Sequence, residues 1–353
     1  MVRSKFYAAA ALLSLACSTA AAYDFTVDGI YYNITSGTDL TVEVTCETSG
    51  YNSYSGDVAV PSQVSSDGTS YTVAAIGDNA FRACTALTSV SVGDGVTAIG
   101  DYAFAECTAL TSVSLPSTVD SLGNRAFTKC EALTSLSLPD AITSMGTYVF
   151  YKATGLTELT MPAGMTEVPQ CTAFGCTALK SVTLHSNITT LGTGSFRDCS
   201  AMTSVTIPAS VTVISAFAFN GCSTLTEVNV LNTTPPTVGS TNAFTTYSSA
   251  TLYVPEGCAE TYGAHSVWSS FNTIGEKDFS EAGIESITTS GGSAFNVVAG
   301  GISMNAEGLA VRIYDITGKM VYSGISTDGE TITVPGAGVY IIRAGSQTTK
   351  AVF

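Results

Sequence analysis

Cysteine thiols are the side chains in this sequence with the clearest potential for chemistry. The 353-residue chain has 10 Cys, and thiols can act as nucleophiles, ligate zinc or form disulfides. A zinc site needs paired Cys-x-x-Cys or Cys/His spacings. The chain lacks them, and we expect no bound metal. Six cysteines instead recur on a 23-residue period: Cys84, Cys107, Cys130, Cys176, Cys199 and Cys222.

Catalysis would need further groups beside a thiol. A cysteine hydrolase pairs its thiolate with a histidine, and His185 follows Cys171 and Cys176 closely in the sequence. We expect Cys176 to point inward and His185 to lie at a strand end, so that the two do not meet. The carboxylates are scattered, and there is no G-x-S-x-G, P-loop or dinucleotide motif. The sequence therefore predicts neither an enzyme nor a cofactor.

The charge balance excludes two kinds of partner. The chain has 13 basic and 28 acidic residues, and 45% of its residues are hydrophobic while only 12% are charged. Such a composition supports a sizeable buried core. The excess negative charge repels phosphate backbones and anionic lipids, so we expect neither nucleic-acid nor membrane-surface binding.

Residues 1–22 have the three parts of a secretory signal peptide. Two basic residues precede a short apolar run, and three alanines precede the expected cleavage site between Ala22 and Tyr23. The run is too short to span a bilayer, and no later segment is long enough, so no transmembrane span is predicted. Acylation at Cys17 is the alternative. In either case we expect the protein to be exported.

A single repeated motif dominates the middle of the chain. Seven coils of equal length fill residues 75–235, and two of them read AIGDNAFRACTALTSVSVGDGVT (75–97) and AIGDYAFAECTALTSVSLPSTVD (98–120). A fixed period of this length is typical of a solenoid, in which each coil buries its apolar face against its neighbours. Coil five has Pro169 in place of a glycine and Phe174 one position late. We interpret this as drift in a tolerant repeat, with a functional kink as the alternative.

Each coil position has a predicted role. The pattern L-x-x-V-x-L places positions 16 and 18 on the buried side of a strand and positions 15 and 17 outside. Proline at position 19, such as Pro116, ends the strand, and glycine at position 3, such as Gly100, permits a tight corner. The next residues look like a short helical turn capped by Asp101, with Phe104 packed inside. The sequence thus predicts 23-residue coils of one strand and a short helical turn.

The strand motif and the A-F-x-x-C turn resemble the leucine-rich repeats of BspA-like surface proteins in all seven coils. The resemblance extends to both flanks. Residues 23–74, with Asp28-Gly29-Ile30-Tyr31-Tyr32, look like the family's β-rich leading cap, and residues 236–277, with Trp268, look like its closing cap. Caps are needed because end coils otherwise expose apolar faces and strand edges.

The recurring cysteines are predicted to be buried and reduced. Stacked coils place equivalent Cβ atoms about 4.8 Å apart, whereas a disulfide needs ~3.5–4.5 Å. Small buried thiols behave as hydrophobic side chains. Cys46 and Cys258 lie in opposite caps and are expected to be too far apart to pair.

Short polar side chains predominate on the outward side of the predicted strands. Ser and Thr occupy most of positions 14, 15 and 17 in the seven coils. They form either an ordinary solvated strand surface or a hydroxyl-rich face for weak, multivalent contact with a glycan or a protein strand. The charged and amide exceptions would supply selectivity. The candidate ligand-face residues are Thr134, Ser135, Thr157, Glu158, Lys180, Ser181, Thr203, Ser204, Glu227 and Asn229.

Residues 278–353 are predicted to form a separate small β-sandwich. Asp315-Ile316-Thr317-Gly318 fits a type I turn between two strands. The run Val311–Asp315, followed by Gly338–Arg343, resembles the C-terminal sorting domain of type IX secretion cargo. This resemblance implies a Gram-negative Bacteroidetes-type cell, passage across the outer membrane and removal of the domain; a retained sandwich module is the alternative. The expected strands are 294–298, 309–314, 319–322, 338–343 and 348–353.

These features together predict an exported leucine-rich-repeat binding protein at the cell surface or outside the cell. The family resemblance implies an adhesin-like role in contact with host matrix proteins, other cells or glycans. The expected partners are an extracellular protein or glycan ligand and the type IX secretion machinery. Two alternatives remain open: a non-catalytic structural or spacing element of the cell surface, and a glycan-capturing accessory to a separate enzyme.

Overall fold

The computed structural model describes residues 23–48 and 50–279, and shorter stretches beyond them. The predicted signal peptide, with Cys17 and Ala22, lies outside the described residues, while Tyr23 is the first residue described. The shorter stretches are residues 295–298, 301–304, 307–308, 310–315, 320–327, 329–334, 339–344 and 347–352.

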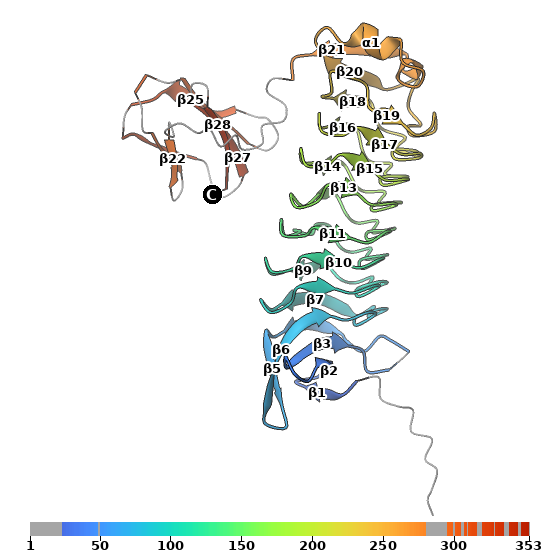
Figure 1. The fold of residues 1–353 in the computed structure, drawn as a ribbon, viewed down its shortest axis with the longest axis vertical. Helices are drawn as coiled ribbons and strands as arrows, with labels where there is room; N and C mark the ends of the chain where they lie inside the picture. The colour runs from blue at the N-terminus through green and yellow to red at the C-terminus, as the bar shows by residue number, and fades with distance from the viewer. Residues whose placement is uncertain are drawn as a thin grey trace, which may run out of the picture.

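Residues 23–279 form an elongated stack of coils (Figure 1). Strands of successive coils pair in parallel with a 23-residue spacing, as Ser121 pairs with Ser144 and Glu158 with Ser181. This pairing confirms the predicted solenoid and its coil length. One side of the stack, which we call the strand face, carries β4 (Gly56–Val60), β7 (Leu87–Val92), β9 (Ser112–Ser114), β12 (Glu158–Thr160), β14 (Ser181–Thr183), β16 (Ser204–Ile207), β18 (Glu227–Val230), β20 (Thr251–Pro255) and β21 (Thr273–Lys277).

A second side of the stack carries a further set of strands. Between residues 98 and 214 these strands are two residues long, begin where the predicted coils begin and pair in parallel from one coil to the next. The second side consists of β3 (Thr41–Thr45), β6 (Thr69–Ile76), β8 (Ala98–Ile99), β10 (Ser121–Leu122), β11 (Ser144–Met145), β13 (Glu167–Val168), β15 (Thr190–Leu191), β17 (Val213–Ile214) and β19 (Thr237–Val238).

The third side, which we call the turn side, consists of hydrogen-bonded turns rather than helix. Positions 5 and 9 of the coils adopt positive φ, as at Tyr102 (56°) and Glu106 (65°), which a right-handed helix excludes. The amide of Tyr102 donates to the carbonyl of Asn124 in the next coil at 2.8 Å. Asp101 caps no helix, because its carboxylate accepts from the amide of Asn124 at 2.6 Å. The expected helical turn is therefore a ladder between coils.

Phenylalanine rings stack through the interior along the axis of the solenoid. Phe127 is fully buried, and its ring centroid lies 5.1 Å from that of Phe104 and 5.7 Å from that of Phe150. Coil five places the buried Ala173 in this row, because its phenylalanine has moved to Phe174, which is half-exposed. The ring stack resumes in the following coils.

The departure of coil five also has an effect on the second side. The amide of Gly146, at position 3, donates to the carbonyl of Leu122 in the preceding coil at 2.8 Å. Pro169 occupies the equivalent position in coil five and has no N–H to donate. The sheet is interrupted at this point, between β11 and β13.

Close approach of the backbone explains the corner glycines, because a Cβ at Gly123 would lie 2.5 Å from the amide nitrogen of Asp101.

The stack extends into both segments that flank the seven repeats. Phe244 stacks on Phe219 at 5.2 Å, and β19 pairs with β17 as a further coil. At the other end, Tyr54 packs on Phe81 at 4.6 Å, and β4 pairs with β7. The solenoid thus has about nine coils.

Antiparallel strands and two short helices close the ends of the stack. At the amino end, β1 (Phe25–Val27) pairs with β2 (Ile30–Ser36), β2 pairs with β3, and β5 (Gln63–Ser66) pairs with β6. At the carboxyl end, the helix α1 (Ala259–Gly263) and the 3₁₀ turn η1 (Trp268–Ser270) bury Tyr262 and Trp268. The Trp268 indole donates to the carbonyl of Pro236 at 2.9 Å. Among the residues that the structure describes, no helix is long and apolar enough to cross a bilayer.

The described residues after 294 form two antiparallel sheets. One contains β22 (Phe295–Val298), β23 (Gly301–Met304) and β26 (Thr331–Thr333), and the other contains β24 (Ala310–Asp315), β25 (Met320–Ile325), β27 (Val339–Ala344) and β28 (Gln347–Val352). Ile302 and Met304 of the first sheet share a buried cluster with Ile313 and Ile342 of the second. This is the predicted small β-sandwich. The expected type I turn extends from Asp315 into residues 316–318, which lie outside the described part.

Candidate functional site

The strand face has the predicted alternation of buried and outward side chains. In β16, Val205 and Ile207 point into the core, while Ser204 and Thr206 are exposed. The alternation arises because successive side chains of a strand point to opposite faces. The outward residues of successive coils therefore form columns along the solenoid.

Most of the predicted ligand-face residues are accessible on this side. Thr157 and Glu227 are half-buried, whereas Asn229 is buried, with 8% of its surface exposed. The strand face thus brings seven exposed candidates together: Thr134, Ser135, Glu158, Lys180, Ser181, Thr203 and Ser204.

Threonine hydroxyls at position 14 have a structural partner. Thr157 Oγ1 donates to the carbonyl of Thr134 in the preceding coil at 3.1 Å, and Thr226 Oγ1 donates to that of Thr203 at 3.2 Å. The same carbonyls accept the backbone amides of Thr157 and Thr226. These hydroxyls therefore stabilise the stacking of coils, and this part of the hydroxyl-rich face is explained without a ligand.

Glu158 and Lys180 are the charged residues in the middle of the strand face. Both side chains are exposed, and neither forms an ion pair with a described residue. Their neighbours Ser135 and Ser181 have exposed hydroxyls that make no hydrogen bond to the described protein. The centre of the face thus offers one positive group, one negative group and several uncommitted hydroxyls to a ligand.

The carboxyl end of the strand face holds a preformed polar cluster. Lys277 Nζ lies 2.8 Å from Glu227 Oε1 and 3.3 Å from Asn229 Oδ1, and it sits 3.6 Å from the ring centroid of Tyr253. The hydrogen bond from Lys277 lowers the pKa of Glu227. Glu227 and Asn229 are therefore held by the protein itself. Lys277, which belongs to β21 of the closing segment, is not among the predicted ligand-face residues.

The amino end of the strand face contains a hydrogen-bonded carboxylate, Asp57, which is also not among the predicted ligand-face residues. Asp57 Oδ1 accepts hydrogen bonds from Thr88 Oγ1 at 2.8 Å and Ser89 Oγ at 2.6 Å, and these bonds lower the pKa of Asp57. A shallow hollow of about 300 Å³ lies here, and Ser91 and Ser112 line it beside Asp57. The strand pattern around Asp57 was visible in the sequence, but its pairing with β7 was not.

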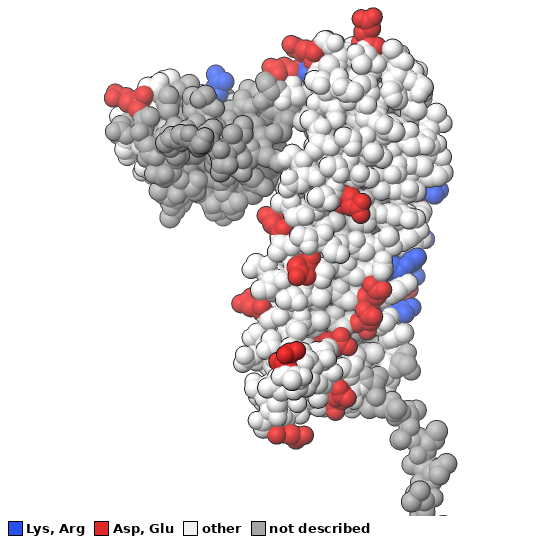
Figure 2. Space-filling view, viewed as in Figure 1, with Lys and Arg blue, Asp and Glu red and all other residues white. Residues whose placement is uncertain are grey.

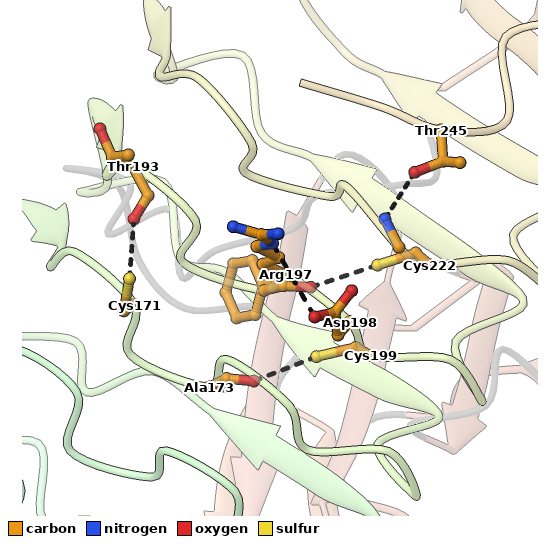
Figure 3. A network of polar contacts seen from close by, with 10 residues as sticks. Cys171, Ala173, Thr193, Arg197, Asp198, Cys199, Cys222 and Thr245 are labelled. Atoms are coloured by element: carbon orange, nitrogen blue, oxygen red, sulfur yellow. Dashed lines mark hydrogen bonds and ion pairs between the residues drawn. The ribbon is translucent and has the colours of Figure 1, made fainter. Parts of the chain in front are cut away.

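The recurring cysteines form a ladder of hydrogen bonds inside the solenoid. Cys130 Sγ donates to the carbonyl of Phe104 at 3.1 Å, and Cys176 Sγ donates to that of Phe150 at 3.0 Å. Figure 3 shows the same contact from Cys199 to the carbonyl of Ala173, at 3.3 Å. Burial raises the pKa of Cys176 to about 12. All nine described cysteines are free thiols.

The geometry around His185 lacks the contact that a cysteine hydrolase needs. Its Nε2 is buried and has no hydrogen-bond partner among the residues that the structure describes, while the thiol of Cys171 points at the carbonyl of Thr193, 3.6 Å away (Figure 3). The thiol of Cys176 is bound to a carbonyl. No cluster of three or more His, Cys, Asp or Glu side chains suited to a metal ion occurs within the described residues.

Comparison with known proteins assigns the repeats to a family. Residues 74–203 and 171–296 match the BspA type leucine-rich repeat region, in six copies. These two ranges together cover more than half of the chain. The chain belongs to the BspA-type leucine-rich repeat family. Solenoids of this family are typically non-catalytic, and leucine-rich repeat proteins generally bind protein ligands.

Solved structures of other leucine-rich repeat proteins resemble this BspA-type chain. A leucine-rich repeat protein from Bacteroides ovatus ATCC 8483 is 25% identical, with a TM-score of 0.52; the match covers 72% of this chain and 67% of that one. A leucine rich cell surface protein from Faecalibacterium prausnitzii A2-165 is 21% identical, with a TM-score of 0.46, and the match covers 73% and 95% of the two chains. No curated protein sequence matches the chain.

Proposed function

We propose that this BspA-type protein is displayed outside the cell and binds an extracellular protein or glycan through its strand face, as an adhesin does. The observation that carries the proposal is the exposed, uncommitted pair Glu158 and Lys180 among free serine hydroxyls. A flat, hydroxyl-rich surface suits weak contacts that add up over several coils. Selectivity then comes from the two charges, because each discriminates between ligands of opposite sign.

The route to the surface is the second part of the proposal. The signal-like amino terminus supports export, and the resemblance of residues 311–315 and 338–343 to type IX sorting domains supports passage across a Bacteroidetes-type outer membrane. The C-terminal sheets have a hydrophobic cluster of their own, as a removable domain requires. We propose that the exported chain consists of a leading cap (23–74), seven repeats (75–235), a closing cap (236–277) and a sorting domain (278–353).

Two other roles use the same fold. A spacing element of the cell surface would need the ring-stacked solenoid but no exposed charges at Glu158 and Lys180. A glycan-capturing accessory would bind through the strand face and serve a separate enzyme. The first role predicts that the strand face is inert, and the second predicts that it binds glycans and no proteins.

A ligand panel with matched variants tests the proposal. The full chain is applied to arrays of extracellular matrix proteins and of glycans, together with Glu158→Gln and Lys180→Glu. Glu167→Gln is the control, since it makes the same change at an exposed carboxylate of β13 on the second side. Binding that both strand-face variants weaken and the control preserves is the expected result. Absence of binding, or equal binding by all variants, would contradict recognition by the strand face.

A further inference from the structure

The basic residues of the solenoid gather on the turn side. Residues 23–277 contain seven Lys and Arg, and Figure 2 shows most of the solenoid's blue side chains along one edge of the column, where some red side chains also lie. The five basic residues at turn-side positions are Arg82, Arg125, Lys129, Lys152 and Arg197.

Aromatic rings alternate with these basic groups along the solenoid. The Arg82 guanidinium lies 4.8 Å from the ring centroid of Tyr51 and 5.0 Å from that of Tyr102. Arg125 lies 4.5 Å from the ring of Tyr148, one coil further on. We call the five basic residues and the rings that they contact the aromatic–basic stripe.

The stripe continues into the following coils and remains open to solvent. Lys152 lies 5.4 Å from the ring centroid of Tyr151, and Arg197 lies 5.1 Å from that of Phe174. Lys152 is exposed, and the other members are half-exposed. The rings therefore present part of their surface to the outside, although aromatic side chains ordinarily gain stability from full burial.

Three of the five cations of the stripe lack an ion pair. Lys129 pairs with Glu106 at 2.9 Å, and Arg197 lies 3.8 Å from Asp198. Arg82, which donates to Asn79 Oδ1 at 3.0 Å, forms no ion pair with any residue that the structure describes, and neither does Arg125 or Lys152. Coils three and four thus present two free cations next to each other.

Several members of the stripe occupy left-handed backbone positions. Tyr102, Arg125 and Tyr148 all occupy position 5 with φ between 56° and 60°, a region in which residues other than glycine are uncommon. Coil six has Gly194 at the same position, with φ of 61°. Glycine is therefore compatible with the fold there, and the large side chains of the earlier coils are not needed to form the turn.

We propose that the aromatic–basic stripe is a binding site for a linear anionic polysaccharide, separate from the strand face. Pyranose rings expose flat C–H surfaces that pack on aromatic side chains, and carboxylate or sulfate groups on the sugar pair with Arg125 and Lys152. The stripe runs along the axis of the solenoid, where successive coils are about 4.8 Å apart, so it suits an extended chain. The net negative charge of the remaining surface repels a broader polyanion such as duplex nucleic acid.

Three polymers and one pair of variants test this site. Polygalacturonate is the anionic probe, its methyl-esterified form is the uncharged control with the same backbone, and polyglutamate is the polyanion without sugar rings. Lys152→Gln removes a free cation of the stripe. Arg312→Gln makes an equivalent change of net charge at an exposed residue of β24, outside the solenoid. Far-UV circular dichroism and the melting temperature check that each variant folds.

We expect the full chain to bind polygalacturonate at low salt, and to bind the methyl ester and polyglutamate at least tenfold more weakly. Lys152→Gln should lower the affinity several-fold, and Arg125→Gln with Lys152→Gln about tenfold, while Arg312→Gln has no effect. Tyr148→Leu should weaken binding of polygalacturonate, because it keeps apolar bulk but removes the aromatic ring.

Several results would overturn the proposal. Equal affinity for polyglutamate would mean that the stripe recognises charge alone. Equal loss in Lys152→Gln and Arg312→Gln would mean that net charge, not the stripe, determines binding. If none of the three polymers binds the folded wild type, the cation–π contacts only stabilise the turns and the proposal is wrong. Loss of strand-face binding in Lys180→Glu bears on the proposed function and not on this site.

Discussion

Phe127→Ala tests whether the ring stack holds the solenoid together. Phe127 is fully buried and has a stacked ring on each side, in Phe104 and Phe150. Removal of a buried phenylalanine destabilises a protein by about 3–5 kcal/mol. We expect a loss at the upper end of that range, since each ring pair adds ~0.5–1.5 kcal/mol beyond the burial of surface.

Phe150→Ala provides an internal comparison. Phe150 is also fully buried, but it stacks on Phe127 alone, because coil five has Ala173 in the row. Phe150→Ala should therefore destabilise the protein less than Phe127→Ala, by about one ring pair, ~0.5–1.5 kcal/mol. Thr134→Ala, on the exposed strand face, should change stability by less than ~0.5 kcal/mol.

Urea unfolding of the full chain measures these differences. Far-UV circular dichroism follows the whole chain, and the fluorescence of Trp268, the single tryptophan, follows the carboxyl end of the stack. Coincident transitions allow a single free energy of unfolding to be assigned. A loss below about 1 kcal/mol for Phe127→Ala, or a larger loss for Phe150→Ala, would refute the reasoning.

The remaining predictions concern thiols, binding, sorting and pH. Cys176 and the other ladder thiols should resist alkylation in the native protein and react after unfolding; peptides bridged by disulfides would contradict this. Lys180→Glu should weaken strand-face binding while the melting temperature falls by no more than about 2 °C. Deletion of residues 278–353 should abolish surface display in cell fractions but leave the solenoid folded. The lowered pKa of Glu227 means that its pair with Lys277 stabilises above the ordinary pKa of a glutamate and is lost as pH falls through the lowered value. The difference in melting temperature between wild type and Lys277→Met should therefore shrink below about pH 4.

Features that repeat with the coils could be predicted from the sequence. The 23-residue offset gives the parallel register, and Phe127 or Cys130 is buried because the same side chain recurs at the same position in neighbouring coils. The outward position of Lys180 follows from strand alternation. A repeated pattern constrains a solenoid strongly, because each coil contacts mainly its neighbours.

Features that depend on backbone conformation or on the end segments could not be predicted. The left-handed residues at position 5 include Tyr102 and Arg125, and neither residue type indicates positive φ, so the stretch read as helical. The contact between Lys277 and Glu227 spans 50 residues, and that between Asp57 and Ser89 spans 32. Neither separation is a multiple of the repeat, so periodicity gave no signal for them.

Labelling of an introduced cysteine on intact cells tests most directly whether the strand face is displayed outside the cell. The nine described native cysteines are buried, so wild type serves as the unlabelled control. Ser135→Cys places a thiol among the exposed residues of the strand face. A membrane-impermeant maleimide should label this variant, and not wild type, on intact cells. Labelling of Ser135→Cys only after lysis would contradict surface display, and no labelling even in the purified folded protein would contradict an exposed strand face.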